Sequence, residues 1–453
     1  MPATWTVPDA APAAPEGVDA ASAAPEGAAP LDAALFRTLL DPLGPFETAP
    51  ALAVAVSGGP DSLALALLAR DWAAARGGSL LALVVDHGLR PGSAEEAARV
   101  AGWLEGLGVP CRRLAWTGTK PRTGLMAAAR AARYGLLESA CRESGILHLL
   151  AGHHRGDQAE TLAMRAEAGS GPFGLAGIAT IVCLPHVRLL RPLLPVPKAR
   201  LIATLEAHGL PWLADPSNVD PRFWRGRFRS RGGGEDALLH DRRALAADRR
   251  EAEAMLLRLL ADHAHVHPLG RLALPLGAFA AAPPPVRRLF LARALAMLGG
   301  SGVPPGLAAL DTLAAALQGG PRLLRATLGG CLLSLCRGRL SIRREPGRIA
   351  HVLPLAQGAW SVWDNRFALL PLRPGLVARP LGRLSLKPDG PPADLRATLP
   401  VIAEGTAGLP LQLGPAPLGG GRIVARVRFR PRGPLLVGTF AESAVATIGE
   451  NLI

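Results

Sequence analysis

The sequence predicts an α/β fold: a parallel sheet covered by helices on both faces, followed by a helical domain and a small β-rich C-terminal domain. Between residues 51 and 168, short apolar runs alternate with amphipathic runs of helical spacing, which is the pattern of repeated strand–helix units. Long charged amphipathic runs then extend to about residue 317, and short β-like runs with turns begin near residue 320. A chain of 453 residues is long enough for several domains with substantial cores.

The first half contains the clearest elements. Residues 1–30 are rich in Ala, Pro and Glu and lack periodic apolar residues, so we predict a disordered tail before a short helix over 31–43. The expected strands are 51–56, 79–86, 111–115 and 148–152, and the expected helices are 62–75, 93–107, 125–144 and 157–168. Ser93 and Glu96 predict a capping box on the second of these helices.

The remaining elements follow a glycine-rich loop at 169–177. A helix is expected to begin at Pro197 and to end near His208, and later helices are expected at 235–262, 285–298 and 305–317. The predicted domains are therefore a tail (1–30), an α/β domain (31–230), a helical domain (231–320) and a β-rich domain (321–453).

Composition restricts the function classes. The formal net charge of +14 favours a polyanionic partner such as nucleic acid, although a GC-rich genome that favours Arg codons is an alternative source of this charge. The five cysteines are widely spaced and form no CxxC, which argues against a disulfide framework, a zinc ribbon or an iron–sulfur site. No apolar run reaches the ~18–20 residues of a membrane span, and the N-terminus lacks the features of a signal peptide. We expect a cytoplasmic protein without a membrane partner.

The motif SGGPDS (57–62) lies directly after the first expected strand. Glycines let backbone N–H groups approach an anion, and the following helix offers its positive end. The lysine of a Walker loop is missing, whereas Asp61 is suited to hold a divalent cation against phosphates. The alternative is an ordinary Gly-Gly turn in which Asp61 caps the helix.

Two further polar pairs follow the ends of expected strands: Asp86-His87 and His153-His154. Ligands of parallel sheets bind at the carboxyl ends of the strands, so these pairs and SGGPDS are expected at one edge. Adjacent strand residues point to opposite faces. We therefore expect no joint metal ligation by the two adjacent histidines, and a structural role for one of them.

SGGPDS resembles the SGGxDS signature of the N-type ATP pyrophosphatases, or PP-loop enzymes. This resemblance implies a Rossmann-like catalytic domain at 31–230 whose loop holds the β- and γ-phosphates of ATP. The α-phosphate is then open to attack, which gives an adenylate and pyrophosphate.

Four more stretches resemble segments of the tRNA(Ile)-lysidine synthase family. They are VVDHGLRPGSAEEAARV (84–100), AARAARY (128–134), AGHHRGDQAETLAMRAEAGSGPFGLAGI (151–178) and RPLLPVPKARLIATLEAHGLPWLADPSNVDPRF (191–223). With SGGPDS, the five blocks stand in the family's order and span about 51–230. The resemblance implies ATP-dependent ligation of free L-lysine to C2 of the wobble cytidine (position 34) of a tRNA(Ile) with a CAU anticodon, through an adenylated tRNA.

The resemblance also implies roles for residues of this chain. ATP would be bound by Ser57, Gly58, Gly59, Pro60, Asp61, Ser62, Asp86 and His87, and Mg²⁺ by Asp61 and Asp157. The catalytic set would be Asp61, Arg130, Arg133, Asp157 and Glu160, with Asp157 and Glu160 three apart on one helix face and the two arginines stabilising phosphate charge. Simpler alternatives are that the acids only satisfy the helix dipole and that the arginines are solvated.

Residues 222–231, RFWRGRFRSR, interleave arginines with aromatic residues. Arginines neutralise phosphates and aromatics stack on unpaired bases, so tRNA binding is expected from Arg222, Arg225, Arg227 and Arg229. The alternative is an interdomain linker whose aromatic residues dock into a core. The basic C-terminal half, including 337–344 and 422–432, is compatible with tRNA binding.

The chain departs from the family pattern at two positions. Gly156 stands where the family has the first Asp of its DD pair, and Gly226 where it has the Asn of RN. These departures leave open a degenerate, non-catalytic RNA-binding protein. Another PP-loop activity, tRNA 2-thiolation, is a second alternative, although its enzymes usually carry paired cysteines. The oligomeric state also stays open, with a homodimer as one expectation.

Overall fold

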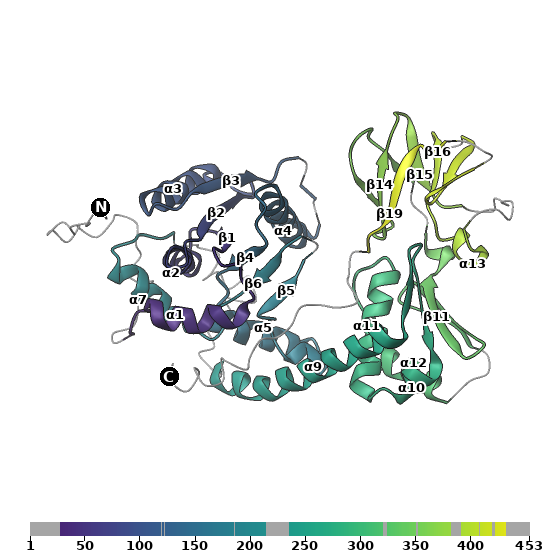
Figure 1. The fold of residues 1–453 in the computed structure, drawn as a ribbon, viewed down its shortest axis with the longest axis horizontal. Helices are drawn as coiled ribbons and strands as arrows, with labels where there is room; N and C mark the ends of the chain where they lie inside the picture. The colour runs from purple at the N-terminus through teal and green to yellow at the C-terminus, as the bar shows by residue number, and fades with distance from the viewer. Residues whose placement is uncertain are drawn as a thin grey trace. The chain divides into compact units, whose positions relative to one another are not determined.

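The structure is a computed structural model that describes residues 28–118, 120–121, 123–184, 186–213, 235–319, 324–349, 352–381, 391–406, 408–418 and 422–431. The described residues form two compact units, one up to Ala247 and one from Asp248 onward (Figure 1). The predicted tail lies almost wholly outside the described residues, as does the basic segment 222–231.

A six-stranded sheet organises the first unit, in the order β3-β2-β1-β4-β6-β5. The four predicted strands are confirmed as β1 (Ala51–Val56), β2 (Ser79–Asp86), β3 (Cys111–Ala115) and β4 (His148–Ala151). They run parallel, with Val54 paired to both Ala82 and Leu150. Two unpredicted short strands extend the sheet: β6 (Arg188–Leu190) is parallel to β4, and β5 (Ile181–Cys183) is antiparallel to β6.

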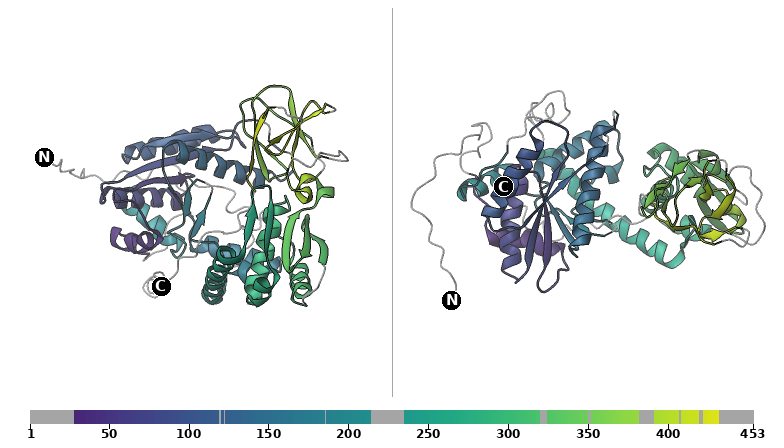
Figure 2. Two further views of the ribbon diagram at one scale, coloured as in Figure 1. Left: turned by 45° about the vertical axis from the view of Figure 1, so that its right-hand side comes forward. Right: turned by 90° about the horizontal axis from the view of Figure 1, so that it is seen from above.

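Helices cover both faces of this sheet, as predicted (Figure 2). Val54 and Val56 of β1 pack into a core with α1 (Ala33–Leu40), α2 (Pro60–Ala74), α3 (Ser93–Gly106) and α7 (Lys198–Ala207). Ala53 and Ala55 point the other way and pack with α4 (Leu125–Glu143). The unit also contains α5 (Arg155–Glu167) and α6 (Pro172–Leu175).

The predicted capping box on α3 is wrong. The N-cap residue is Gly92, whose φ of +82° lies in the left-handed region that glycine adopts readily. Ser93 is already inside the helix, and its hydroxyl donates a hydrogen bond to Asp86. Glu96 instead accepts a hydrogen bond from Arg90 at 2.7 Å.

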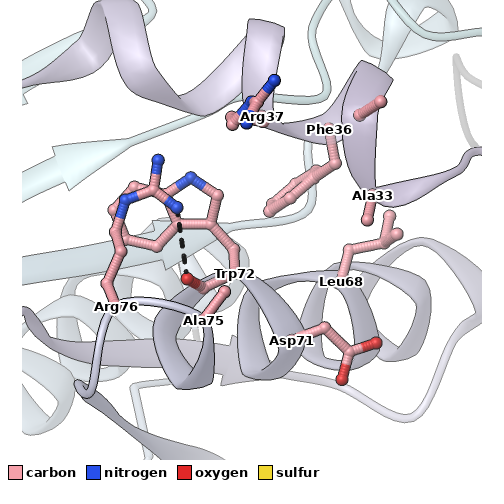
Figure 3. A pocket seen from close by; sticks show the side chains of 9 residues that line it. Ala33, Phe36, Arg37, Leu68, Asp71, Trp72, Ala75 and Arg76 are labelled. Carbon is pink, nitrogen blue, oxygen red and sulfur yellow. Dashed lines mark hydrogen bonds between the residues drawn. The ribbon is translucent and has the colours of Figure 1, made fainter.

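A hollow of about 560 Å³ lies between α1 and the C-terminal half of α2 (Figure 3). Phe36, Leu68 and Trp72 line it, and Arg76 stacks over the Trp72 ring at 3.9 Å. Trp72 is eleven residues beyond Asp61 on α2, which corresponds to roughly 16 Å along the helix. This hollow is therefore distinct from the loop at the start of α2.

The second unit contains the later residues of α9 (Glu235–His263) and three more helices, α10 (Leu276–Ala281), α11 (Pro284–Leu298) and α12 (Leu307–Gln318). It also contains an antiparallel sheet in the order β7-β8-β11-β10-β9. The bounds are β7 His265–His267, β8 Arg271–Pro275, β9 Leu324–Leu328, β10 Cys331–Cys336 and β11 Arg339–Arg344. The segment expected to be helical thus also supplies β7 and β8. The domain boundary at residue 320 stays a prediction.

The rest of the second unit is β-rich, as predicted, with the short helix α13 (Ala393–Arg396). One sheet has the order β12-β15-β16-β17-β18 and another β13-β14-β19. The bounds are β12 Leu353–Pro354, β13 Ser361–Trp363, β14 Phe367–Pro371, β15 Leu376–Arg379, β16 Val401–Glu404, β17 Pro410–Leu413, β18 Ala416–Pro417 and β19 Ala425–Phe429. Across all described residues, no helix is long and apolar enough to span a bilayer.

A buried ion cluster joins β11 to the hairpin between β13 and β14. Asp364 accepts two hydrogen bonds from Arg344, both at 2.9 Å, and one from Arg366 at 2.7 Å. All three side chains are at most 8% exposed. Removing one member of such a cluster leaves buried charge without compensation.

We predict that Asp364→Asn lowers the free energy of unfolding by at least about 3 kcal/mol, because two buried arginines lose their counter-charge. Asparagine tolerates the φ of +49° at this position, so the substitution tests the charge. Urea unfolding of the full chain measures the effect. The matched control is Glu404→Gln, whose partner Arg373 is exposed and whose loss changes stability by less than about 1 kcal/mol. Equal effects would contradict the prediction.

Candidate active site

The loop 57–62 connects β1 to α2 and is held by internal hydrogen bonds. Ser62, which is 6% exposed, accepts a hydrogen bond from the backbone N–H of Ser57 at 3.1 Å and donates one to the carbonyl of Gly59 at 3.0 Å. The hydroxyls of Ser57 and Ser62 are 3.3 Å apart. Ser62 therefore braces the loop, and Ser57 is exposed at its tip.

The two glycines of the loop have different constraints. Gly58 has a φ of +86°, and a Cβ there would lie 2.6 Å from Val100 and 2.7 Å from Leu213. Gly59 is the N-cap residue of α2 with a φ of −73°, and its Cβ would have only one neighbour, 3.9 Å away. The loop therefore requires glycine at residue 58, and it presents the N-terminus of a 15-residue helix to an anion.

The turn after β4 packs directly on this helix start. A Cβ at Gly152 would lie 3.0 Å from the carbonyl carbon and oxygen of Asp61. This close approach brings Nε2 of His154 to 3.8 Å from a carboxylate oxygen of Asp61 and to 3.8 Å from one of Asp157. The structure thus brings together the two predicted metal ligands, Asp61 and Asp157, around one histidine.

His154 and Asp157 also cap α5. Nδ1 of His154 accepts a hydrogen bond from the backbone N–H of Gly156 at 3.0 Å, and Asp157 accepts one from the backbone N–H of His154 at 2.9 Å. The helix-capping alternative for Asp157 therefore accounts for one of its carboxylate oxygens. His154 is 4% exposed and has the structural role that we expected of one histidine in the pair.

Asp86 and His87 lie at the end of β2, at the same edge of the sheet. Burial alone would raise the pKa of Asp86, but hydrogen bonds from Gly88 and Ser93 and the nearby His87 and Lys120 lower it below its ordinary value. Burial lowers the pKa of His87, and Arg133 adds to that effect. Nδ1 of His87 is buried, and none of the described residues forms a hydrogen bond with it.

Arg133 of α4 lies partly buried at this edge. Burial lowers the pKa of its guanidinium, and it interacts electrostatically with both His87 and His153. Arg130 is exposed and lies over the ring of Tyr134 at 5.0 Å. The solvated alternative therefore fits Arg130 better than Arg133.

Arg191, which follows β6 and is 5% exposed, is a further residue of this edge that was not predicted from the sequence. Its Nε donates a hydrogen bond to Nδ1 of His153 at 3.2 Å, and Nη1 donates one to the carbonyl of Ala179 at 2.6 Å. It also forms a side-chain hydrogen bond with Tyr134. Arg191 begins the RPLL stretch, but β6 has only three residues, too short a pattern to predict a strand end.

The glycine-rich loop packs against α5. The amide of Gln158 both accepts a hydrogen bond from the N–H of Ile178 at 2.7 Å and donates one to its carbonyl at 3.0 Å. Arg165 donates hydrogen bonds to the carbonyls of Gly174 and Gly177 at 2.7 and 2.8 Å. These contacts hold the glycine-rich loop against α5, the helix that follows the end of β4.

The other predicted site residues have different outcomes. Glu160 lies on α5 and is 2% exposed. Gly226 lies outside the described part of the chain. So do the predicted tRNA-binding residues, which are Arg222, Arg225, Arg227 and Arg229. Within the described part, no three His, Cys, Asp or Glu side chains form a group that would hold a metal by themselves.

This edge can bind an anion at the start of α2 and in front of Arg133, and a cation between the carboxylates of Asp61 and Asp157. Such a combination suits a nucleotide polyphosphate with a divalent cation, since Mg²⁺ usually takes one or two carboxylates together with phosphate oxygens. A cationic group that approaches Asp157 would lie next to the phosphates.

Comparison with known proteins finds a matching domain family and similar proteins. Residues 32–232 match the family model of the PP-loop domain. A tRNA(Ile)-lysidine synthase of Bradyrhizobium diazoefficiens is 42% identical over 331 residues, which cover 67% of this chain and 92% of that protein. A protein of the same name from Methylobacterium nodulans is 44% identical over 71% of this chain and 98% of its own length.

The similarity extends into the second unit. A tRNA(Ile)-lysidine synthase of Rhizobium meliloti is 35% identical over 412 residues, or 85% of this chain and 89% of that protein. Among solved structures, a U34-tRNA thiolase of Methanococcus maripaludis is similar with a TM-score of 0.39 and 19% identity, over 47% of this chain and 78% of that one.

We predict that Gly58→Ala destabilises the protein by about 2 kcal/mol or more, because a side chain there combines a strained positive φ with overpacking against Val100 and Leu213. Chemical denaturation of the full chain measures the effect. Gly59→Ala is the matched control, and it should change stability by less than about 1 kcal/mol. A Gly58→Ala protein as stable as this control would show that the loop is not packed as described.

Proposed function

Since the chain belongs to the tRNA(Ile)-lysidine synthase family, we propose that it joins lysine to C2 of the wobble cytidine, position 34, of a tRNA(Ile) with a CAU anticodon. It is an ATP-dependent ligase of the PP-loop type. The observation that carries this function is that Asp61 of the loop 57–62 meets His154 and Asp157 at one edge of the sheet.

The proposed reaction has two steps. The O2 atom of the cytosine attacks the α-phosphorus of ATP, a P–O bond to the β-phosphate breaks, and pyrophosphate leaves. The side-chain amine of lysine then attacks C2, the C2–O bond breaks, and AMP leaves with the former O2 atom. The amine gives up its protons to groups of the site or to solvent. The product is lysidine.

The loop 57–62 and the start of α2 would hold the β- and γ-phosphates through backbone N–H groups, since a helix N-terminus favours anions. His87 supports a ligand here, because its buried Nδ1 has no hydrogen-bond partner among the described residues. The partly buried guanidinium of Arg133 is suited to stabilise charge that develops on the α-phosphate. Arg130, which is exposed, would act at the rim.

Magnesium fits the donor set of Asp61 and Asp157, because both carboxylates face the same atom of His154 and Mg²⁺ favours one or two carboxylates with phosphate oxygens. When bound, it would neutralise phosphate charge. We propose that Asp157 and Glu160, three apart on α5, bind the lysine ammonium. Because residue 156 is glycine, it adds no third carboxylate to Asp157 and Glu160.

The tRNA contacts proposed for Arg222, Arg225, Arg227 and Arg229 rest on their interleaving with aromatic residues. We propose a cytoplasmic location, since all five cysteines are free thiols as a reducing compartment would keep them. A homodimer stays a prediction, and the mass of the free protein in solution would test it.

The cysteines argue against the thiolation alternative. All five lie in the described residues, and the three in the first unit, Cys111, Cys141 and Cys183, lie away from the carboxyl edge of the sheet. Cys111 begins β3, Cys183 pairs with the first residue of β6, and Cys141 stands near the end of α4. Burial raises the pKa of Cys111 to about 11 and that of Cys141 to about 12, which disfavours the thiolate that such chemistry requires.

One experiment tests the function directly. The purified protein is incubated with an unmodified tRNA(Ile) transcript, ATP and lysine, and the nucleosides are analysed by mass spectrometry. A gain on cytidine equal to lysine minus water is expected. Binding of the tRNA without this product and without ATP–pyrophosphate exchange would favour the non-catalytic alternative.

We predict that Asp61→Asn lowers the rate of ATP–pyrophosphate exchange at least about 100-fold, since the proposed Mg²⁺ site beside the phosphates loses a charged ligand. The affinity for tRNA should stay within about threefold, because the proposed contacts of Asp61 are with the metal and ATP and not with tRNA. Exchange assays and filter binding measure the two quantities. A parallel loss of both would mean that Asp61 is needed for the structure of the loop.

We predict that Asp157→Asn raises the KM for lysine more than the KM for ATP. Asparagine keeps an acceptor for the N–H of His154, so the helix cap is preserved while the charge is removed. Steady-state kinetics with each substrate varied in turn give both constants. The opposite order would assign Asp157 chiefly to the metal.

A further inference from the structure

Arg191 connects three parts of the site. It stands directly after β6, and its backbone N–H donates a hydrogen bond to the carbonyl of Thr180 at 2.9 Å. Its side chain is buried and contacts His153 after β4, Tyr134 on α4 and the carbonyl of Ala179 after the glycine-rich loop. The rotamer of Arg191 is therefore held by contacts on several sides.

The contact with His153 determines which ring nitrogen carries a proton. An arginine side chain has only N–H donors and no acceptor. Nδ1 of His153, 3.2 Å from Nε of Arg191, must therefore present its lone pair. A neutral imidazole with a free lone pair on Nδ1 carries its proton on Nε2, and the ring can then only donate from that atom.

The surroundings of His153 keep the ring neutral. The charged groups that face it are Arg191 after β6, Arg130 and Arg133 on α4, and Asp157 on α5. Burial is the largest cause that lowers the pKa of His153, to about 3, and the three arginines add to it while Asp157 opposes them. A second proton on the ring would also break the hydrogen bond from Arg191.

We propose that Arg191 is a positioning residue that holds His153 as the Nε2–H tautomer, so that His153 serves the site as a neutral hydrogen-bond donor and never as the base for the incoming amine. The second half of this statement rests on the proposed function. The proton that the lysine ammonium loses then passes to a carboxylate of the site or to water: an N–H bond breaks and an O–H bond forms, with no change at His153.

The opposite edge of the sheet provides a matched control. Arg188, the first residue of β6, lies with Nη1 3.5 Å from Nδ1 of His148, the first residue of β4. Both pairs join β6 to β4, so they share strands and chemistry. Only the pair of Arg191 and His153 lies at the carboxyl edge.

The tautomer is tested by long-range ¹H–¹⁵N correlation spectra of the full chain labelled with ¹⁵N-histidine. The His153 signals are identified by their loss in His153→Gln. We expect the Nε2–H pattern unchanged from pH 5.5 to 8. In Arg191→Met the ring loses the donor to Nδ1, so the Nδ1–H form should become populated beside the Nε2–H form, whereas Arg188→Met should leave the His153 pattern unchanged. An Nδ1–H pattern in the wild type, or a ring that titrates near pH 6.5, would overturn the proposal.

The proposal that His153 is not the base for the lysine amine is tested by the rate of lysine attack in single turnovers between pH 6 and 9. His153→Gln keeps an N–H donor without a titrating group, and we expect a rate within about tenfold of wild type with the same pH profile. Loss of a base would instead slow the step by roughly 10²–10⁴ and would refute the assignment. If the wild type forms no lysidine but shows the Nε2–H ring, the proposed function fails while the role of Arg191 in fixing the tautomer stands.

Discussion

The close approach of Gly152 to the backbone of Asp61 is the constraint on which the site depends. The end of β4 approaches the start of α2 this closely because residue 152 has no side chain: a Cβ would lie 3.0 Å from the carbonyl carbon and oxygen of Asp61, which is tighter than most Cβ contacts in proteins. Parallel pairing of β1 and β4 sets both strand ends at one edge, and the glycine closes the remaining gap. His154 is then held between the carboxylates of Asp61 and Asp157, which puts an anion-binding loop and a pair of acids side by side.

This edge of the sheet carries both arginine side chains and carboxylates. Burial lowers the pKa of Arg133 and of Arg191 at this edge, and Asp61 and Asp157 bring two carboxylates to His154. The ring of His153 stays neutral because burial and the nearby arginines oppose a further positive charge on it. A site of this kind can hold a phosphate group next to an ammonium group, and under the proposed function the ammonium must lose a proton before its nitrogen attacks C2.

Part of the positive charge of the chain serves the fold. In the second unit Asp364 binds Arg344 and Arg366, and Asp394 binds Arg271 and Arg343. Each acid holds two arginines, so these basic residues are engaged inside the unit. The run 337–344, which by composition alone is compatible with RNA binding, therefore contains two arginines whose contacts are internal. A contribution of the other basic residues of the C-terminal half to tRNA binding stays a prediction.

The sequence by itself determined the parallel strands β1 to β4, the helices that cover them and the loop 57–62, because apolar periodicity and glycine conformation act within a few residues. It did not determine the capping of α3, where Gly92 replaced Ser93, or the short strands β5 and β6, whose three residues carry no periodic signal. Only the tertiary structure decided that Arg191 meets His153, 38 residues away. That contact depends on which strands lie side by side, and sheet order is set by the packing of the whole unit and not by any local pattern.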